Sequence, residues 1–268
     1  MKILNKDTFK KKKYNVFITS YVGLDYFNGW SSTLKGLEDI QLIIIDSGNQ
    51  SVAKEFPFPV YQTSRNIGCA GCWNLIAYIG FELYGLDQII IGQDDAKFTS
   101  EMVKHIWQET TDDILPGAYT NGFEFSCFGL TKKFYETVGM FDENFVYFGC
   151  EDNDYTHRLQ LFNKRLKCLN YSSIMNNNIT TRKIEENIQN GKIYNIDSNI
   201  RIYKEYYNVI YLHKKWGTNY EYRNPFNDAS KSPTECDIHL GLTNIYGNVV
   251  KFPSLVEIEN LQKELCYA

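Results

Sequence analysis

The chain is poor in the residues that define disulfide-bonded, zinc-binding or membrane-spanning proteins. It has seven cysteines, an odd number at scattered positions, and only four histidines in 268 residues. Its one C-x-x-C, formed by Cys69 and Cys72, has no second pair to complete a zinc site. No apolar run approaches the ~18–20 residues of a transmembrane helix, and no signal-peptide segment opens the chain. We therefore expect reduced thiols and a cytoplasmic location.

Basic charge is also in short supply. The 28 Lys and Arg are outnumbered by 32 Asp and Glu, and the net charge is −4. This balance argues against an overall positive field that would draw nucleic acid or anionic lipid. A basic, aromatic stretch at residues 201–223 leaves nucleic-acid binding open, although a helix covering a sheet edge explains it too. Aromatic residues make up 15% of the chain, which suits carbohydrate or nucleobase sites as well as core packing.

Strand and helix signals alternate through the first two thirds of the chain. This alternation predicts an α/β fold with a mostly parallel central sheet flanked by helices. Strands are predicted at residues 14–20, 41–45, 60–62, 89–91, 114–119, 124–130 and 165–170. Helices are predicted at residues 28–37, 52–56, 70–84, 100–109, 131–138 and 151–162. From residue 183 the composition shifts, and helices are predicted at 194–216 and 255–265.

The central strand ends in two adjacent carboxylates. Ile89, Ile90 and Ile91 form an apolar run typical of a strand buried on both faces, and Asp94 and Asp95 follow it. Ligands of open α/β sheets bind at such carboxyl ends of strands. Neighbouring carboxylates repel each other unless a cation or proton intervenes, and Mg²⁺ and Mn²⁺ prefer oxygen ligands. The alternative is that one Asp caps the helix that starts near residue 99.

Other polar residues follow neighbouring strands. Asp46 ends the second predicted strand, and Asn66 follows the third. Because the ends of parallel strands share one edge, we expect these side chains to gather near Asp94 and Asp95. Each also has a local explanation: Asp46 can cap the segment that begins at residue 51, and Asn66 can hold a tight turn.

A second acidic cluster, residues 151–154, opens a predicted helix. Acidic residues are favoured there by the helix dipole, which is the simplest explanation. Asp154 and Arg158 are spaced as an i, i+4 pair. Glu151 or Asp152 would then be free at the helix tip, beside the aromatic loop 145–149. A carboxylate in that place could remove a proton from a bound hydroxyl.

These motifs together resemble the GT-A nucleotide-sugar glycosyltransferases, and most closely glycosyltransferase family 2. The matching pieces cover roughly residues 14–170 in the family's order: FITSY (17–21), IIIDSG (43–48), RNIGCAGCWN (65–74), QDD (93–95), VGMFDENF (138–145) and EDNDYTHRL (151–159). YLHKKWG (211–217) resembles a late segment of bacterial members. The resemblance implies a GT-A catalytic domain at 14–178 and a C-terminal helical extension at 179–268. The catalytic domain would comprise a nucleotide-sugar-binding part (14–98) and an acceptor part (99–178).

The resemblance also implies a role for individual residues. Residues implied to contact the nucleotide are Thr19, Tyr21, Asp46, Asn66, Gly68 and Asp94. Asp46 would hydrogen-bond the base, typically uracil, while Asp94 and Asp95 would bind Mn²⁺ or Mg²⁺ at the donor diphosphate. Asp152 would be the general base, with Glu151 beside it.

The chain departs from the family in two places. Asp94 and Asp95 are contiguous, whereas the two acids of the family's motif are separated by a spacer. Which of the two would contact the metal directly therefore stays open. Relatives often have a His after the last core strand, where this chain has SSIMNNN (172–178), so Asn176 or Asn177 would substitute for it.

The implied activity is an inverting transfer of a sugar from a UDP-sugar to a hydroxyl of a saccharide or glycoconjugate. Retention of configuration stays open, because retaining animal enzymes share the EDxD motif. Two different functions also stay open: glycosylation of a hydroxymethylated base in viral DNA, and noncatalytic binding of sugar nucleotides.

Overall fold

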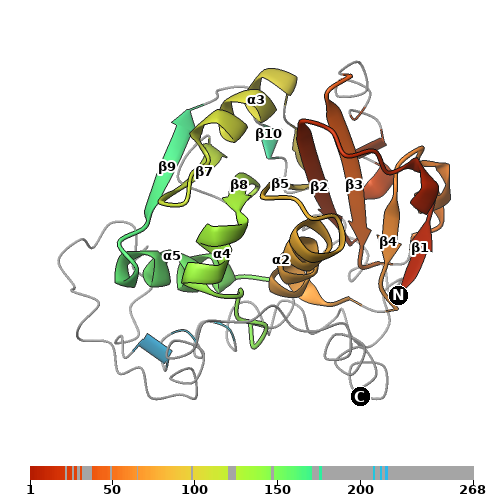
Figure 1. Cartoon of the computed structure of the whole chain (residues 1–268). Coiled ribbons are helices and arrows are strands. Elements are labelled where there is room, and N and C mark those ends of the chain that lie inside the picture. The colour runs from red at the N-terminus through yellow and green to blue at the C-terminus, as the bar shows by residue number, and fades with distance from the viewer. Residues whose placement is uncertain are drawn as a thin grey trace.

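A central sheet of eight strands runs through the molecule (Figure 1). In chain order its strands are β1 (Lys2–Leu4), β2 (Tyr14–Ser20), β3 (Ile40–Asp46), β4 (Val60–Gln62), β5 (Gln88–Gln93), β7 (Ile114–Tyr119), β8 (Cys127–Thr131) and β9 (Arg165–Asn170). Their order across the sheet is β1-β4-β3-β2-β5-β8-β7-β9. Two short strands, β6 (Ala96–Lys97) and β10 (Met175–Asn176), form a separate antiparallel pair.

The structure is a computed structural model. It describes residues 1–21, 23–25, 27–28, 31, 38–48, 50–64, 66–97, 99–119, 125–145, 148–170, 175–176, 208, 212 and 215–216.

Helices cover both faces of the sheet. One face carries α2 (Gly68–Ala77), the π-helical η3 (Tyr78–Leu83), α4 (Lys132–Val138) and α5 (Glu151–Leu161), and the other carries α3 (Ser100–Glu109) (Figure 1). Two short 3-10 helices, η1 (Lys6–Thr8) and η2 (Ser51–Glu55), precede β2 and β4. This layered arrangement confirms the predicted α/β fold class.

The continuous apolar runs of the central strands follow from burial on both faces. In β2, Phe17 packs into the core under α2, while Val16 and Ile18 pack into the core under α3. In β5, Ile91 faces the first core and Ile90 the second. Because successive strand residues point to opposite faces, a strand between two helical layers needs apolar residues at every position.

Most predicted elements are confirmed, with differences in strand direction and helix geometry. Four of the seven strand pairings are parallel; β8 is antiparallel to both β5 and β7, and β1 is antiparallel to β4. The helix predicted at 70–84 changes to π-helical geometry at Tyr78. It passes so close to β5 that a Cβ on Gly80 would lie 2.8 Å from Ile89 Cγ2. β1 and the small β6–β10 pair were not predicted from the sequence.

Several predictions lie outside the described residues. These are most of the helix predicted at 28–37, the helix predicted at 255–265, and the helix predicted at 194–216 apart from Asn208, Leu212, Lys215 and Trp216. Those four residues have helical backbone.

The parallel register brings the ends of four strands to one edge. Ser20 pairs with Asp46, and Asp46 pairs with Gln62. On the other side of β2, Thr19 pairs with Gln93, and Asp94 and Asp95 form the turn after β5. The ends of these strands therefore lie at one edge of the sheet, as predicted, and hydrogen bonds through Gln50 and Ser20 join Asp46 to Asp94 there.

Candidate active site

Asp46 lies at the centre of a hydrogen-bond network at this edge. Its side chain is fully buried. Oδ1 accepts from the Gly48 N–H at 3.0 Å and from Gln50 Nε2 at 3.1 Å. Oδ2 accepts from the Gln50 N–H at 2.7 Å and from Gln62 Nε2 at 2.8 Å. The carboxylate thus organises the loop after β3 and the end of β4, and its role in binding a base stays a prediction.

Ser20 connects this network to the carboxylates after β5. Gln50 Nε2 donates to Ser20 Oγ at 2.9 Å, and Ser20 Oγ lies 2.5 Å from Asp94 Oδ2. An amide nitrogen can only donate, so the single hydroxyl proton of Ser20 is directed to Asp94. This orients Asp94 as an acceptor, which is the form that a cation requires.

Asp94 and Asp95 have the surroundings of a metal-binding pair. They are 3% and 5% exposed. A Cβ on Gly23 would lie 2.2 Å from Asp94 Oδ2, so the loop after β2 meets this carboxylate with no room for a side chain. Among the described residues no group of three or more His, Cys, Asp or Glu could hold a metal. Two buried carboxylates fit Mg²⁺ or Mn²⁺ when water or substrate phosphate supplies the other oxygens.

The β6–β10 pair brings a later segment to the turn that carries Asp94 and Asp95. Asn176 in β10 is paired with Ala96 in β6, and Ala96 directly follows Asp95. The backbone at Asn176 therefore runs beside the turn that carries both acids. This is the segment in which the sequence predicts a substitute for the missing His; Asn177, the other candidate, lies outside the described residues.

Thr19 and Tyr21 flank the end of β2. Thr19 is mostly buried, and its hydroxyl donates to the carbonyl of Gly92 at 3.4 Å. Tyr21 is partly exposed, and its carbonyl approaches Gly48 so closely that a Cβ there would lie 1.6 Å from the oxygen. The loops after β2 and β3 are therefore in direct contact, as a shared nucleotide-binding edge requires.

Asn66 and Gly68 shape the entry to α2. Asn66 Oδ1 accepts from the Gly68 N–H at 2.9 Å, and Gly68 has a left-handed φ of 73°. This is the tight turn considered for Asn66 from the sequence. It places the first turn of α2 against the sheet edge.

The first turn of α5 carries the second acidic cluster. Glu151 is 5% exposed and Asp152 is partly exposed. Asp152 Oδ1 accepts from the Asn153 N–H at 2.8 Å. Cys150, the N-cap, has a left-handed φ of 73° and makes no side-chain capping bond. The acidic side chains, rather than a conventional cap, therefore occupy the positive end of this helix.

Two cysteines of α2 show how these clusters lie relative to each other. Burial raises the pKa of the Cys69 thiol well above its usual value, and the charges of Glu151, Asp152 and Asp95 raise it further. Burial also raises the pKa of Cys72 to about 12, with smaller contributions from charges that include Asp46 and Asp94. The start of α2 is thus within electrostatic reach of the β3 end, the β5 end and the α5 tip.

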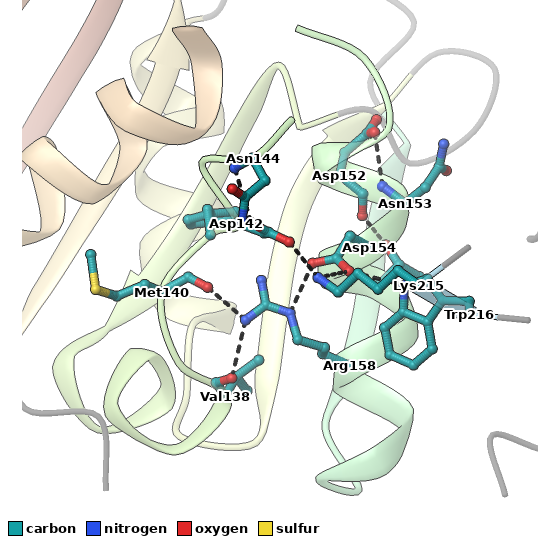
Figure 2. Close-up of polar contacts among 12 residues, drawn as sticks. Val138, Met140, Asp142, Asn144, Asp152, Asn153, Asp154, Arg158, Lys215 and Trp216 are labelled. Atoms are coloured by element: carbon teal, nitrogen blue, oxygen red, sulfur yellow. Dashed lines mark hydrogen bonds and ion pairs between the residues drawn. The ribbon is translucent and has the colours of Figure 1, made fainter. Parts of the chain in front are cut away.

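A buried ionic cluster that was not predicted from the sequence supports α5 (Figure 2). Lys215 Nζ lies 2.7 Å from Asp142 Oδ2 and also pairs with Asp154 Oδ1. Trp216 Nε1 donates to the same Asp154 oxygen at 2.9 Å. Arg158 Nε donates to Asp154 Oδ2 at 3.1 Å, which confirms the i, i+4 pair expected from the sequence.

The comparisons with known proteins return solved structures only: no family model and no curated protein matches the chain. The mannosyltransferase PcManGT from Pyrobaculum calidifontis, in complex with GDP-Man and Mn²⁺, matches with a TM-score of 0.48 at 10% identity over 77% of this chain and 71% of its own. GalNAc-T7 with UDP, GalNAc and Mn²⁺ matches with a TM-score of 0.46 at 11% identity, over 59% of this chain and 42% of its own.

A third match is the catalytic domain of Drosophila β1,4-galactosyltransferase 7 in complex with xylobiose. Its TM-score is 0.44 at 9% identity, over 62% of this chain and 68% of its own. All three are glycosyltransferases, the class that the sequence motifs resemble. Likenesses of this degree do not define an activity for this chain.

Asn74, at the end of the RNIGCAGCWN motif, holds the 138–145 loop in place. Its Nδ2 donates to the Phe141 carbonyl at 2.9 Å and to Glu143 Oε1 at 2.7 Å. Its Oδ1 accepts from the Phe141 N–H and from the Tyr135 hydroxyl, both at 2.9 Å. The motif gave no role to Asn74, whose partners lie more than 60 positions away.

The sequence favours an exposed face of its helix for His157, and this expectation is wrong. The ring is only partly exposed and lies 5.1 Å from the Trp216 ring, and burial lowers its pKa. No described helix is both long enough and apolar enough to span a bilayer. The cytoplasmic location stays a prediction.

Proposed function

We propose that the protein is a metal-dependent glycosyltransferase that moves a sugar from a UDP-sugar to the hydroxyl of a saccharide or glycoconjugate, with inversion. One observation carries the proposal. Asp94, after β5, belongs to one hydrogen-bond network with Ser20, Gln50 and Asp46 at the ends of β2 and β3, and Asp95 follows it directly. A second acidic pair, Glu151 and Asp152, opens α5. One pair at a strand end suits a cation, and one pair at a helix tip suits proton transfer.

The donor half of the site consists of the strand ends. Asp94 and Asp95 would hold Mn²⁺ or Mg²⁺, which when bound neutralises the negative charge on the departing nucleoside diphosphate. Thr19 and Tyr21 would border the base, and Asn66 and Gly68 would border the rest of the nucleotide. The support for this assignment is the contact between the β2 and β3 loops and the tight turn that opens α2.

The acceptor half consists of the tip of α5. Asp152 is partly exposed, whereas Glu151 is buried, so Asp152 has the better access to an incoming hydroxyl. As general base, Asp152 takes the proton of the acceptor hydroxyl while the oxygen of that hydroxyl attacks the anomeric carbon of the donor sugar. Glu151 adds a second negative charge at the same helix tip. Because this base belongs to α5, whereas the diphosphate would be held at the strand ends, we expect the hydroxyl to attack from the face opposite the leaving group, hence with inversion.

A panel of nucleotide sugars tests the function. The protein is mixed with UDP-, GDP- and CDP-sugars, with and without Mn²⁺, and its melting temperature is measured, because a ligand that binds the folded state raises it. Release of nucleotide and the anomeric configuration of the product by NMR are then followed with simple saccharides as acceptors. We expect Mn²⁺-dependent stabilisation by UDP-sugars, hydrolysis of the same donors and an inverted product.

The outcomes distinguish this function from its rivals. Binding of UDP-sugars without any hydrolysis or transfer would contradict the enzyme and indicate a noncatalytic binding protein. A retained configuration would contradict inversion and the role of Asp152. Transfer to hydroxymethylated DNA, but to no saccharide, would contradict the proposed acceptor class.

A further inference from the structure

The ammonium group of Lys215 is buried between two carboxylates that come from different segments (Figure 2). The side chain is 4% exposed, and its partners Asp142 and Asp154 are 4% and 0% exposed. Lysine is among the residues least often buried, and then only with partners. Its position here therefore requires a specific arrangement of opposite charge.

The charges of this cluster balance. Asp142 and Asp154 supply two negative charges, and Arg158 and Lys215 supply two positive charges. Removing one member of a buried set leaves an uncompensated charge, whereas replacing both members of a pair by apolar groups is often nearly neutral. Single and double substitutions in the cluster can therefore separate an effect on stability from an effect on geometry.

The two partners of Lys215 belong to segments that shape the acceptor half. Asp154 lies two residues after Asp152, in the first turn of α5. Asp142 lies in the loop that Asn74 ties to α2. Lys215 therefore joins the first turn of α5 to the loop that Asn74 ties to α2.

A second contact from the same part of the chain reaches the backbone just before α5. Asn208 Nδ2 donates to the Phe148 carbonyl at 3.0 Å, two residues before Cys150. Cys150 itself makes no side-chain cap. The described residues of the C-terminal part thus contact the chain both before and after the uncapped start of α5.

We propose that Lys215 is a positioning residue: its bridge between Asp142 and Asp154 sets the place of Asp152 as the general base for the acceptor hydroxyl. The proposal rests on the proposed function. It extends the acceptor site to the C-terminal part of the chain, which the sequence assigns to a separate extension. The donor carboxylates follow β5, whereas Lys215 pairs with Asp142 in the 138–145 loop and with Asp154 in α5, so we expect donor binding not to depend on it.

The experiment compares the wild type with Lys215→Met and with the double variant Lys215→Met/Asp142→Ala. The single variant leaves a buried carboxylate unpaired. The double variant restores charge balance without restoring the bridge. For each protein the melting temperature, the affinity for UDP with Mn²⁺ by calorimetry and the kcat of transfer are measured. Comparing melting temperature with kcat separates a structural role from a positioning role.

We expect Lys215→Met to lower both the melting temperature and kcat. In the double variant the melting temperature recovers, UDP affinity equals that of the wild type, and kcat stays about 10²-fold low, the loss expected when a reacting group is misplaced. Recovery of kcat together with the melting temperature overturns the proposal, as does normal kcat in either variant. If the single variant does not fold, the double variant decides alone. A wild type that transfers no sugar overturns the proposed function and this proposal together.

Discussion

Ser20 Oγ lies 2.5 Å from Asp94 Oδ2, so the end of β2 is hydrogen-bonded to the turn after β5. Gln50 sets the direction of this bond. Because Gln50 Nε2 donates to Ser20 Oγ, the hydroxyl proton of Ser20 is left to donate to Asp94. Gln50 donates with the same nitrogen to Asp46. One amide group thus connects the β3 loop with a carboxylate of the metal-binding pair.

The first prediction uses two glutamines that share one partner. Both Gln50 and Gln62 donate to Asp46, but only Gln50 reaches Ser20. Gln50→Met should weaken Mn²⁺-dependent UDP binding by about 10-fold or more, the usual cost of losing a group that orients a metal ligand. Calorimetry with and without Mn²⁺ measures this. Gln62→Met is the matched control, and an equal loss in both variants would mean that Asp46, not the connection to Asp94, controls affinity.

The second prediction concerns the carboxylates themselves. Asp95→Ala should abolish the response of UDP affinity to Mn²⁺ while the protein stays folded, because one carboxylate and water cannot replace the pair. Asp87→Ala is the control, since Asp87 is exposed and precedes β5 at its opposite end. UDP titrations with and without Mn²⁺ give the answer. An Asp95→Ala protein that still responds to Mn²⁺ would rule out Asp95 as a ligand.

The edge of the sheet was predictable because its signals are local. An apolar run that stops at Asp46, or at Gln93 and Asp94, defines a strand end without knowledge of any partner. Whether the Asp46 carboxylate is available to a ligand or is hydrogen-bonded within the protein depends on Gln62, which lies 16 positions further on in another strand. No pattern within one element contains that information.

The support of α5 was not predictable for the same reason. Lys215 and Asp142 are 73 positions apart, and the sequence around neither residue shows an amphipathic pattern that would mark a buried ion pair. His157 was expected on an exposed helix face, but the ring of Trp216, from the C-terminal part of the chain, lies 5.1 Å from the His157 ring. The resemblance of residues 211–217 to a late family segment was the only signal at this place.

The third prediction separates chemistry from binding. Asp152→Asn keeps the size of the side chain and an oxygen for the Asn153 N–H, so the fold and the UDP affinity should change little. Transfer should fall by ~10²–10⁴-fold, the typical contribution of a general base. Steady-state kinetics and calorimetry on the same preparation measure both quantities. If Glu151→Gln alone abolishes transfer, the base is Glu151, and near-normal turnover in the Asp152 variant would contradict the assignment.

The fourth prediction concerns the pH dependence of stability. Burial lowers the pKa of His157, and the charge of Asp154 offsets this only in part. The unfolded chain, with a His pKa near 6.5, therefore binds a proton at pH values where the folded protein does not. Stability rises with pH wherever the unfolded state binds more protons. The free energy of unfolding should thus fall as the pH is lowered from ~7.5 to ~5.5 because of His157.

Urea unfolding at several pH values, for the wild type, His157→Gln and His105→Gln, isolates this contribution. His105 is an exposed residue of α3 that pairs with Glu109, far along the chain from the Lys215 cluster. His157→Gln should flatten the dependence between pH ~7.5 and ~5.5, since glutamine does not titrate, whereas His105→Gln should keep it. The difference between the two variants cancels the background from carboxylates such as Glu143, whose pKa is raised by burial. An unchanged pH dependence in His157→Gln would show that the imidazole is accessible to protons in the folded protein, and hence that Trp216 does not cover it in solution.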